Sequence, residues 1–231
     1  METRLACTRV SWADFAQNWR TSYYDFTRSQ AERKNKGEEL AFKTVDDHHH
    51  DSLRELISLS GIDGLWTDEE VLEISRIWHY LDGWSDSSKG LQRLKEQGLT
   101  LCTLSNGNLS LLQDMATHAD LPWTHVFSAE KFGAYKPHPS VYTGACKELS
   151  LEPGECAMVA AHLGDLQAAK ESGLQTIYVE RLDEESWPLE KVREAKRKGT
   201  FDIWVGMDEK IDGGGILEVA RHLEKPASVL Q

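Results

Sequence analysis

The sequence lacks both a long hydrophobic run and an excess of basic residues. Its first residues, METRLACTRVSW, contain no apolar segment of the kind found in a secretory signal, and no later run is as long as a membrane span. The formal net charge is -12 at pH 7, which makes nucleic acid or an anionic membrane surface an unfavourable partner. We therefore expect neither partner.

Cysteine is also scarce and unpatterned. Cys7, Cys102, Cys146 and Cys156 are far apart in the sequence, with none of the spacings that mark zinc sites. This distribution predicts free thiols in a reducing compartment, for which the cytoplasm is the default. It argues against a disulfide framework.

The first part of the chain reads as helices only. After Ser11, apolar side chains recur at helical spacing as Trp12, Phe15, Trp19, Tyr23 and Phe26. Further helices are predicted over residues 46–59 and, behind the capping box that begins at Thr67, over residues 67–81. We expect residues 1–84 to form one helical domain.

From residue 85 the chain alternates between strands and helices, which predicts a parallel α/β sheet with right-handed crossovers. We expect residues 85–231 to form this second domain. The predicted strands are 99–104, 124–127, 156–161, 175–179 and 201–205, and the predicted helices are 90–97, 108–118, 139–149, 165–172 and 211–223. The charged stretch 182–199 is predicted to be a solvated excursion.

Three strand-to-helix junctions carry polar residues where a parallel sheet binds ligands. They are Ser105-Asn106-Gly107, the segment around Lys136, and the segment from His162 to Asp165. Each has an ordinary structural interpretation as well: Ser, Asn and Asp cap helices, a lysine is commonly a surface residue, and a histidine can be structural. Their order along the chain carries more information than any one of them.

That order resembles the haloacid dehalogenase-like (HAD) superfamily: a strand followed by Ser-Asn-Gly, then Lys-Pro before a helix, then a strand, a loop and Asp. With Trp19-Arg20 and Tyr142, the chain is similar to the L-2-haloacid dehalogenases. The segments SLRELISLSGI, DLPWTHVFSAEKFGAYKPHPSVY and MVAAHLGDLQAAKESGLQTIYVER are similar to fungal members of that type. The resemblance covers nearly the whole chain.

The resemblance implies a Rossmann-like core with a helical cap, here residues 1–84, and covalent catalysis by a carboxylate that attacks C2 of a 2-haloacid. It also assigns roles to residues of this chain. Those implied to bind substrate are Arg20, which takes the halide or the substrate carboxylate, and Ser105, Asn106 and Tyr142. Those implied to be catalytic are Lys136, which orients the nucleophile and lowers its pKa, Asp165, which positions water or Lys136, and His162.

Two positions depart from the dehalogenase pattern. Ala160 stands where these enzymes carry serine, and His162 stands where they carry asparagine; the histidine can still orient a water molecule. A HAD phosphatase is the alternative enzyme, but phosphatases bring further carboxylates for Mg²⁺, and here Asp165 is followed by Leu-Gln-Ala-Ala-Lys. We expect no metal and no cofactor.

The nucleophile motif of the family, an apolar strand ending in Asp with Gly-Thr shortly after, is missing. The acids before or at the start of the first predicted helix are Glu2 and Asp14, and neither ends an apolar strand. We therefore expect the first, central strand of the sheet to be absent and the chain to be truncated, and we expect no turnover by the chain as it stands. A non-catalytic anion-binding pseudoenzyme is the alternative.

The consecutive histidines and the expected partners remain to be considered. His48, His49 and His50 follow one another on a predicted helix and point in different directions, so we predict solvated side chains and no metal site. The expected partner is a small anionic substrate, and the sequence leaves a homodimer open.

Overall fold

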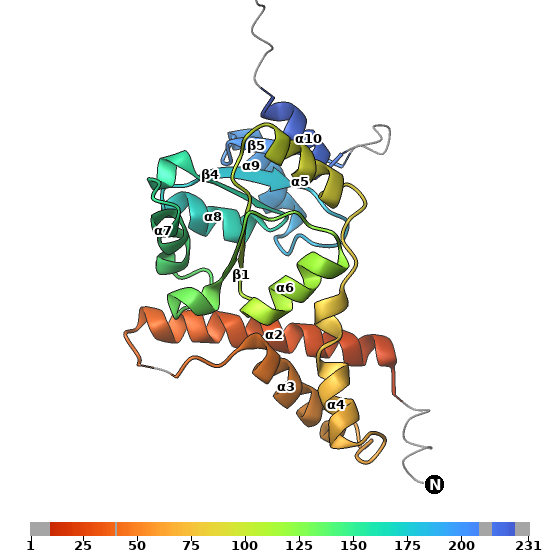
Figure 1. Ribbon diagram of the computed structural model, residues 1–231. Helices are drawn as coiled ribbons and strands as arrows, with labels where there is room; N and C mark the ends of the chain where they lie inside the picture. The colour runs from red at the N-terminus through yellow and green to blue at the C-terminus, as the bar shows by residue number, and fades with distance from the viewer. Residues whose placement is uncertain (1–9, 40, 208–213, 225–231) are drawn as a thin grey trace, which may run out of the picture.

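The computed structural model describes residues 10–39, 41–207 and 214–224. Figure 1 shows an α/β core with the N-terminal helices lying beneath it, the long helix α2 running across its lower side. The chain begins with the helices α2 (Trp12–Asn35), α3 (Val45–Leu59) and α4 (Asp68–Ser75), followed by the 3₁₀ turn η1 (Ile77–Tyr80). Cys7 and Glu2 lie outside the described residues.

The starts of the N-terminal helices follow the capping signals in the sequence. Ser11 accepts the backbone N–H of Asp14 at the start of α2, and Thr44 and Thr67 form capping boxes at the starts of α3 and α4. The apolar stripes then pack together around a buried cluster formed by Trp19, Leu53, Ile57, Ile62 and Val71. The first two predicted helices are confirmed.

The predicted helix 67–81 is wrong in its second half. The α-helix ends at Ser75 and a 3₁₀ turn follows, so that Ile77 is 56% exposed instead of buried. The tighter turn places His79 inward, where Nδ1 lies 2.7 Å from Asp114 Oδ2 and Nε2 lies 3.0 Å from Asp46 Oδ1. These contacts join η1 to α3 and to the core, which a continuous amphipathic helix would not do.

The core contains parallel strands, as predicted. Its elements run in the order α5 (Ser87–Glu96), β1 (Cys102–Ser105), α6 (Leu109–His118), β2 (His125–Ser128), η2 (Ala129–Phe132), α7 (Pro139–Glu148), η3 (Pro153–Glu155), β3 (Ala157–Ala160), α8 (Leu163–Glu171), β4 (Gln175–Val179), α9 (Leu189–Lys198), β5 (Ile203–Val205) and α10 (Ile216–His222). Strand β1 is shorter than predicted at its start, and residues 211–213 of the predicted last helix lie outside the described part of the chain.

Hydrogen bonding divides the strands into two parallel sheets. One has the order β1-β2 and the other the order β3-β4-β5. Within the described residues, β1 and β3 therefore each use one edge for pairing. The two strands nevertheless share a packing layer, because Leu104 of β1 and Met158 of β3 both contact the cluster formed by Tyr142, Cys146, Ala169 and Leu174.

The segment 182–199 is not the solvated excursion that the sequence predicts. Its second half is α9, and Trp187, Val192 and Ala195 pack with Leu163 and Tyr178 in one cluster. The physical reason is that the charges of this segment hide a narrow apolar stripe. The first half folds back toward the start of α8, and its contacts are described with the site.

The expectation of solvated histidines is wrong for His49, which is 3% exposed. Its ring stacks on Trp78 with centroids 5.1 Å apart and meets Trp19 edge-on at 5.9 Å. His48 stacks on Phe26 and bonds to Ser22. No group of three or more metal-ligating side chains is found among the described residues.

We expect His49→Phe to make the protein more resistant to acid. Burial lowers the pKa of His49 to about 4, whereas an unfolded histidine has a pKa of about 6.5. The unfolded state therefore gains protons first as the pH falls below about 6.5, and stability is lost down to about pH 4. Between pH 7.5 and pH 5, the variant should avoid about 2 kcal/mol of this loss in the free energy of unfolding. Urea titrations at the two pH values measure it, and equal losses in both proteins would contradict the assignment.

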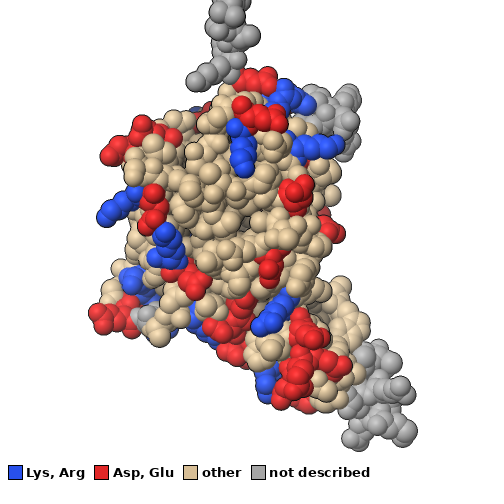
Figure 2. All heavy atoms as spheres, viewed as in Figure 1, with Lys and Arg blue, Asp and Glu red and all other residues tan. Residues whose placement is uncertain are grey.

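Charge is spread unevenly over the surface. Figure 2 shows acidic side chains gathered over the lower part of the molecule, where α4 contributes Asp68, Glu69 and Glu70. Among the helices of the described residues, none combines the length and the apolar character needed to cross a lipid bilayer.

Candidate functional site

The end of β1 is joined to the next junction by Asn106. Its Oδ1 accepts the backbone N–H of Lys136 at 2.7 Å, and its Nδ2 donates to the backbone oxygen of Lys136 at 3.3 Å. Asn106 thus uses both ends of its amide to hold the Lys136 backbone. In this geometry it positions Lys136, and Nδ2 has a second N–H that these two bonds do not use.

The neighbouring residues show why this junction has its composition. Ser105 Oγ accepts the N–H of Gly107 at 3.2 Å, which leaves its hydroxyl hydrogen available to a ligand. A Cβ on Gly107 would lie 3.0 Å from a Leu111 methyl carbon, so glycine allows α6 to pack closely. The N–H of Leu109 at the start of α6 is already bound by Glu130 at 3.1 Å. At this junction Ser105 therefore offers a hydroxyl donor, whereas Glu130 already binds the N–H of Leu109 at the start of the helix.

Lys136 and Asp165 meet directly, as their order in the sequence predicts. Lys136 Nζ lies 2.6 Å from Asp165 Oδ2, and the two side chains are only 15% and 17% exposed. The fully buried Tyr142 donates its hydroxyl to Asp165 Oδ1 at 2.6 Å. Burial, together with the Asp165 charge and this hydrogen bond, raises the pKa of Tyr142 well above its ordinary value, so Tyr142 remains a donor.

The N-terminal helices contribute Arg20 from α2. Its Nη2 lies 3.2 Å from Tyr24 OH and 3.2 Å from Glu184 Oε2. Burial opposes the charge, but Tyr24 and Glu184 outweigh it and raise the pKa of Arg20 above its ordinary value. His162 is close by, with Nε2 3.4 Å from the same Glu184 oxygen. The contact lacks hydrogen-bond geometry, and Nε2 is a buried atom without a hydrogen-bond partner in the described structure.

Two residues at this site, Tyr23 and Glu184, are not among the site residues predicted from the sequence. Tyr23, one turn after Arg20 on α2, faces the amide of Asn106 and the charge of Asp165; burial raises the pKa of its hydroxyl. The helical spacing from Arg20 was the available signal. Glu184 had no such signal, since it lies in a charged loop and its partner Arg20 is 164 positions away.

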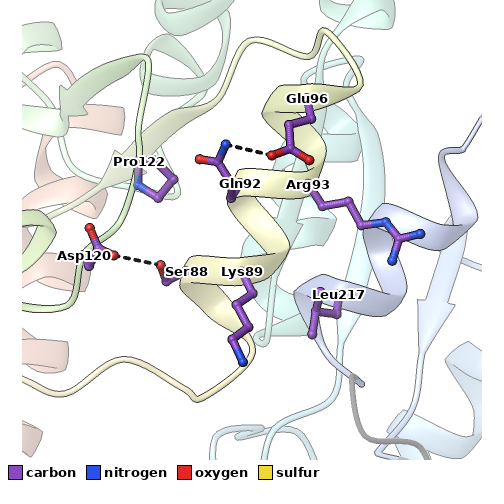
Figure 3. Close-up of a pocket in the computed structure, with 8 residues that line it drawn as sticks. All are labelled: Ser88, Lys89, Gln92, Arg93, Glu96, Asp120, Pro122 and Leu217. Atoms are coloured by element: carbon purple, nitrogen blue, oxygen red, sulfur yellow. Dashed lines mark hydrogen bonds between the residues drawn. The ribbon is translucent and has the colours of Figure 1, made fainter.

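A surface hollow on α5 is separate from these residues. Figure 3 shows it between α5, the 120–122 loop and α10, lined by Ser88, Gln92, Glu96, Asp120 and others. Its polar groups largely satisfy one another, since Gln92 bonds to Glu96 and Ser88 to Asp120. Largely buried charged side chains, here Lys136 and Asp165, are typical of catalytic sites, and the hollow on α5 has no comparable pair among the described residues.

The polar junctions therefore come together from several elements. Lys136, Asp165 and Tyr142 form one bonded group, and Asn106 ties this group to the end of β1. Arg20, Glu184 and His162 form a second group between α2 and the start of α8. Tyr23, on the same helix as Arg20, faces Asn106 and Asp165 of the first group.

Comparisons with a family model and with solved structures point to the same family. A family model described as haloacid dehalogenase-like hydrolase matches residues 5–173. A solved structure of the L-2-haloacid dehalogenase PA0810 is 32% identical with a TM-score of 0.76, over 93% of this chain and 84% of that chain. The defluorinating L-2-haloacid dehalogenase Rha0230 has 31% identity and the same TM-score, over 93% and 81%.

Curated relatives agree over a shorter region. (S)-2-haloacid dehalogenase 4A of Burkholderia cepacia is 33% identical over 103 residues, which is 44% of this chain and 45% of that protein. The Pseudomonas putida (S)-2-haloacid dehalogenase H-109 is 28% identical over 121 residues, or 51% and 54%. The chain thus spans about half the length of the curated relatives it matches. The resemblance to the L-2-haloacid dehalogenase type is confirmed, and the chain belongs to the haloacid dehalogenase-like hydrolases.

Proposed function

We propose that the site binds a 2-haloacid and that its residues support dehalogenation at C2. The observation that carries the proposal is the Lys136–Asp165–Tyr142 group, where a largely buried ammonium is held beside the start of α8, which follows β3, and is tied through Asn106 to the end of β1. Arg20 supplies a second cation from α2, and Ser105 supplies a hydroxyl. Two cations and a hydroxyl donor suit an acid whose carboxylate and halide both carry negative charge during the reaction.

The carboxylates in contact with these groups do not qualify as the attacking group. Within the described residues these are Asp165, with one donor on each oxygen, and Glu184, which is paired with Arg20. Asp14 is exposed in the first turn of α2 and is no better placed. We propose that the nucleophile belongs to a further parallel strand between β1 and β3, whose facing edges have no backbone partner in the described structure.

The reaction would then proceed in two displacements. A carboxylate oxygen on the added strand attacks C2, the carbon–halogen bond breaks, and the halide leaves with the bonding electrons. Water then attacks the acyl carbon of the ester, which releases the 2-hydroxy acid and restores the carboxylate. In this scheme Arg20 binds the halide or the acid carboxylate, Lys136 orients the nucleophile, and His162 and Asp165 position the water.

The same scheme assigns the two parts of the chain. Residues 1–84 would be the cap that closes the site with Arg20 and Tyr23, and residues 85–231 the core that holds the remaining groups. Free thiols at Cys102, Cys146 and Cys156 are consistent with a reducing compartment, which we propose to be the cytoplasm. Sedimentation would establish whether the protein is a monomer or the homodimer that the sequence leaves open.

The test uses an Asp-strand protein, defined as this chain preceded by an apolar strand that ends in Asp-x-x-Gly-Thr. We expect halide release from (S)-2-chloropropionate without added Mg²⁺, and no phosphate release from small phosphate esters. Phosphate release that depends on Mg²⁺ would identify a phosphatase instead. Binding of 2-chloropropionate without any release would indicate an anion-binding protein without catalysis.

A further inference from the structure

Glu184 contacts both Arg20 and His162, two side chains that the proposed reaction requires to be free. One oxygen, Oε2, lies 3.2 Å from Arg20 Nη2 and 3.4 Å from His162 Nε2. The Arg20 and Glu184 side chains are 37% and 29% exposed, so the pair is accessible to a small ligand from solvent. A carboxylate of the protein therefore sits where Arg20 would receive an anion.

This placement is built into the fold. Just before Glu184, Arg181 is bound through both terminal nitrogens to Asp86, at 2.7 and 2.8 Å. Just after it, Glu185 accepts the N–H of Leu163 at 2.8 Å and the N–H of Trp187 at 2.7 Å. Because both flanks are fixed, Glu184 is presented to Arg20 by its loop and does not reach it as a freely moving surface side chain.

We infer that Glu184 is a specificity-determining residue. It forms an ion pair with Arg20 in the absence of substrate, and the carboxylate or halide of the incoming acid displaces it. This inference rests on the proposed function, since it takes Arg20 as the anion-binding group. An anion can bind Arg20 only if it competes with a tethered carboxylate, so weakly binding anions are excluded. Displacement also frees Glu184 to turn to His162, whose buried Nε2 has no hydrogen-bond partner among the described residues.

The test is calorimetric titration of the 231-residue chain with (S)-2-chloropropionate, which serves here as a carboxylate ligand. Glu184→Gln should lower Kd on the order of three- to tenfold, because an exposed ion pair and a nearby like charge are removed together. Tighter binding is a result that structural damage would not produce. Glu190→Gln is the matched control: it removes one charge from an exposed position at the start of α9, away from Arg20, and should leave Kd within about twofold.

The Arg20→Ala background shows whether the effect passes through Arg20. There, adding Glu184→Gln should change Kd by less than about twofold, because the pair no longer exists. Equal tightening with and without Arg20, or equal tightening by Glu190→Gln, would overturn the inference. If wild type binds and Glu184→Gln binds no better, the inference fails and the proposed function stands. If neither protein binds, both fail.

Discussion

Lys136→Ala is expected to lower the kcat for halide release by the Asp-strand protein on the order of a hundredfold or more, as the loss of a preorganised charge does elsewhere. The ammonium is held 2.6 Å from Asp165 and is largely shielded from water, so it is fixed in position and weakly screened by solvent. Asn106 holds the backbone of Lys136 through two hydrogen bonds, which adds to the positioning of its side chain.

Lys131→Ala is the matched control for this change. Lys131 lies on η2 and pairs with Glu148 at the surface, where both side chains are more than two-fifths exposed. Its removal should leave halide release unchanged. A melting curve for each variant separates lost chemistry from lost folding. A folded Lys136→Ala protein that keeps its rate would show that Lys136 does not stabilise the reacting charges.

Asp86→Ala is expected to have the largest effect on stability, lowering the free energy of unfolding by about 3 kcal/mol. Asp86 and Arg181 form a two-bond ion pair with side chains only 11% and 12% exposed, and Asp86 also accepts the N–H of Ile216 at 2.6 Å. The pair joins the start of α5 to the end of β4 and the start of α10. Without the carboxylate, the buried guanidinium is left uncompensated.

Urea denaturation at pH 7 measures this loss. Asp82→Ala, which removes a carboxylate that is 98% exposed, should cost less than about 1 kcal/mol. The double variant Asp86→Ala, Arg181→Met should be more stable than Asp86→Ala alone, because the unpaired charge is removed as well. Equal losses for Asp86→Ala and Asp82→Ala would show that the pair does not hold these elements together.

The same carboxyl group gives a pH dependence with a definite sign. Burial opposes its ionisation, but the bonds from Arg181 and Ile216 outweigh this and lower the pKa of Asp86 below its ordinary value. Its contribution to stability is therefore complete above the pKa of about 4 of an unfolded aspartate and is lost as the pH falls below it.

Much of the fold could be predicted from local signals. The capping residues Ser11 and Thr67 and the apolar spacing after them place the starts of α2 and α4, and β4 has the predicted bounds. Where a predicted element is wrong, as in the helix 67–81, the reason is also physical. His79 ends the helical stripe early because its ring binds two carboxylates from other elements, and no local pattern reports such a contact.

In the candidate site, too, some residues could be predicted from local sequence signals and others could not. The positions of Lys136, Asp165 and Tyr142 could be predicted because each lies just before a helix or in its first turn, in a fixed order along the chain. Glu184 could not, since its ion pair links residues far apart in the sequence and its loop reads as polar surface. Asn106 was identified as part of the site, but its partner proved to be the backbone of Lys136.

Halide release by two matched proteins shows whether a carboxylate on the added strand attacks C2. One is the Asp-strand protein, and the other is identical except that the strand ends in Asn. We expect steady chloride release from (S)-2-chloropropionate by the first and none by the second, because the amide cannot displace the halide as the carboxylate does. We also expect none from the 231-residue chain alone. Chloride release by that chain, or equal release by the Asp and Asn proteins, would show that another group attacks C2 and that the proposed nucleophile is wrong.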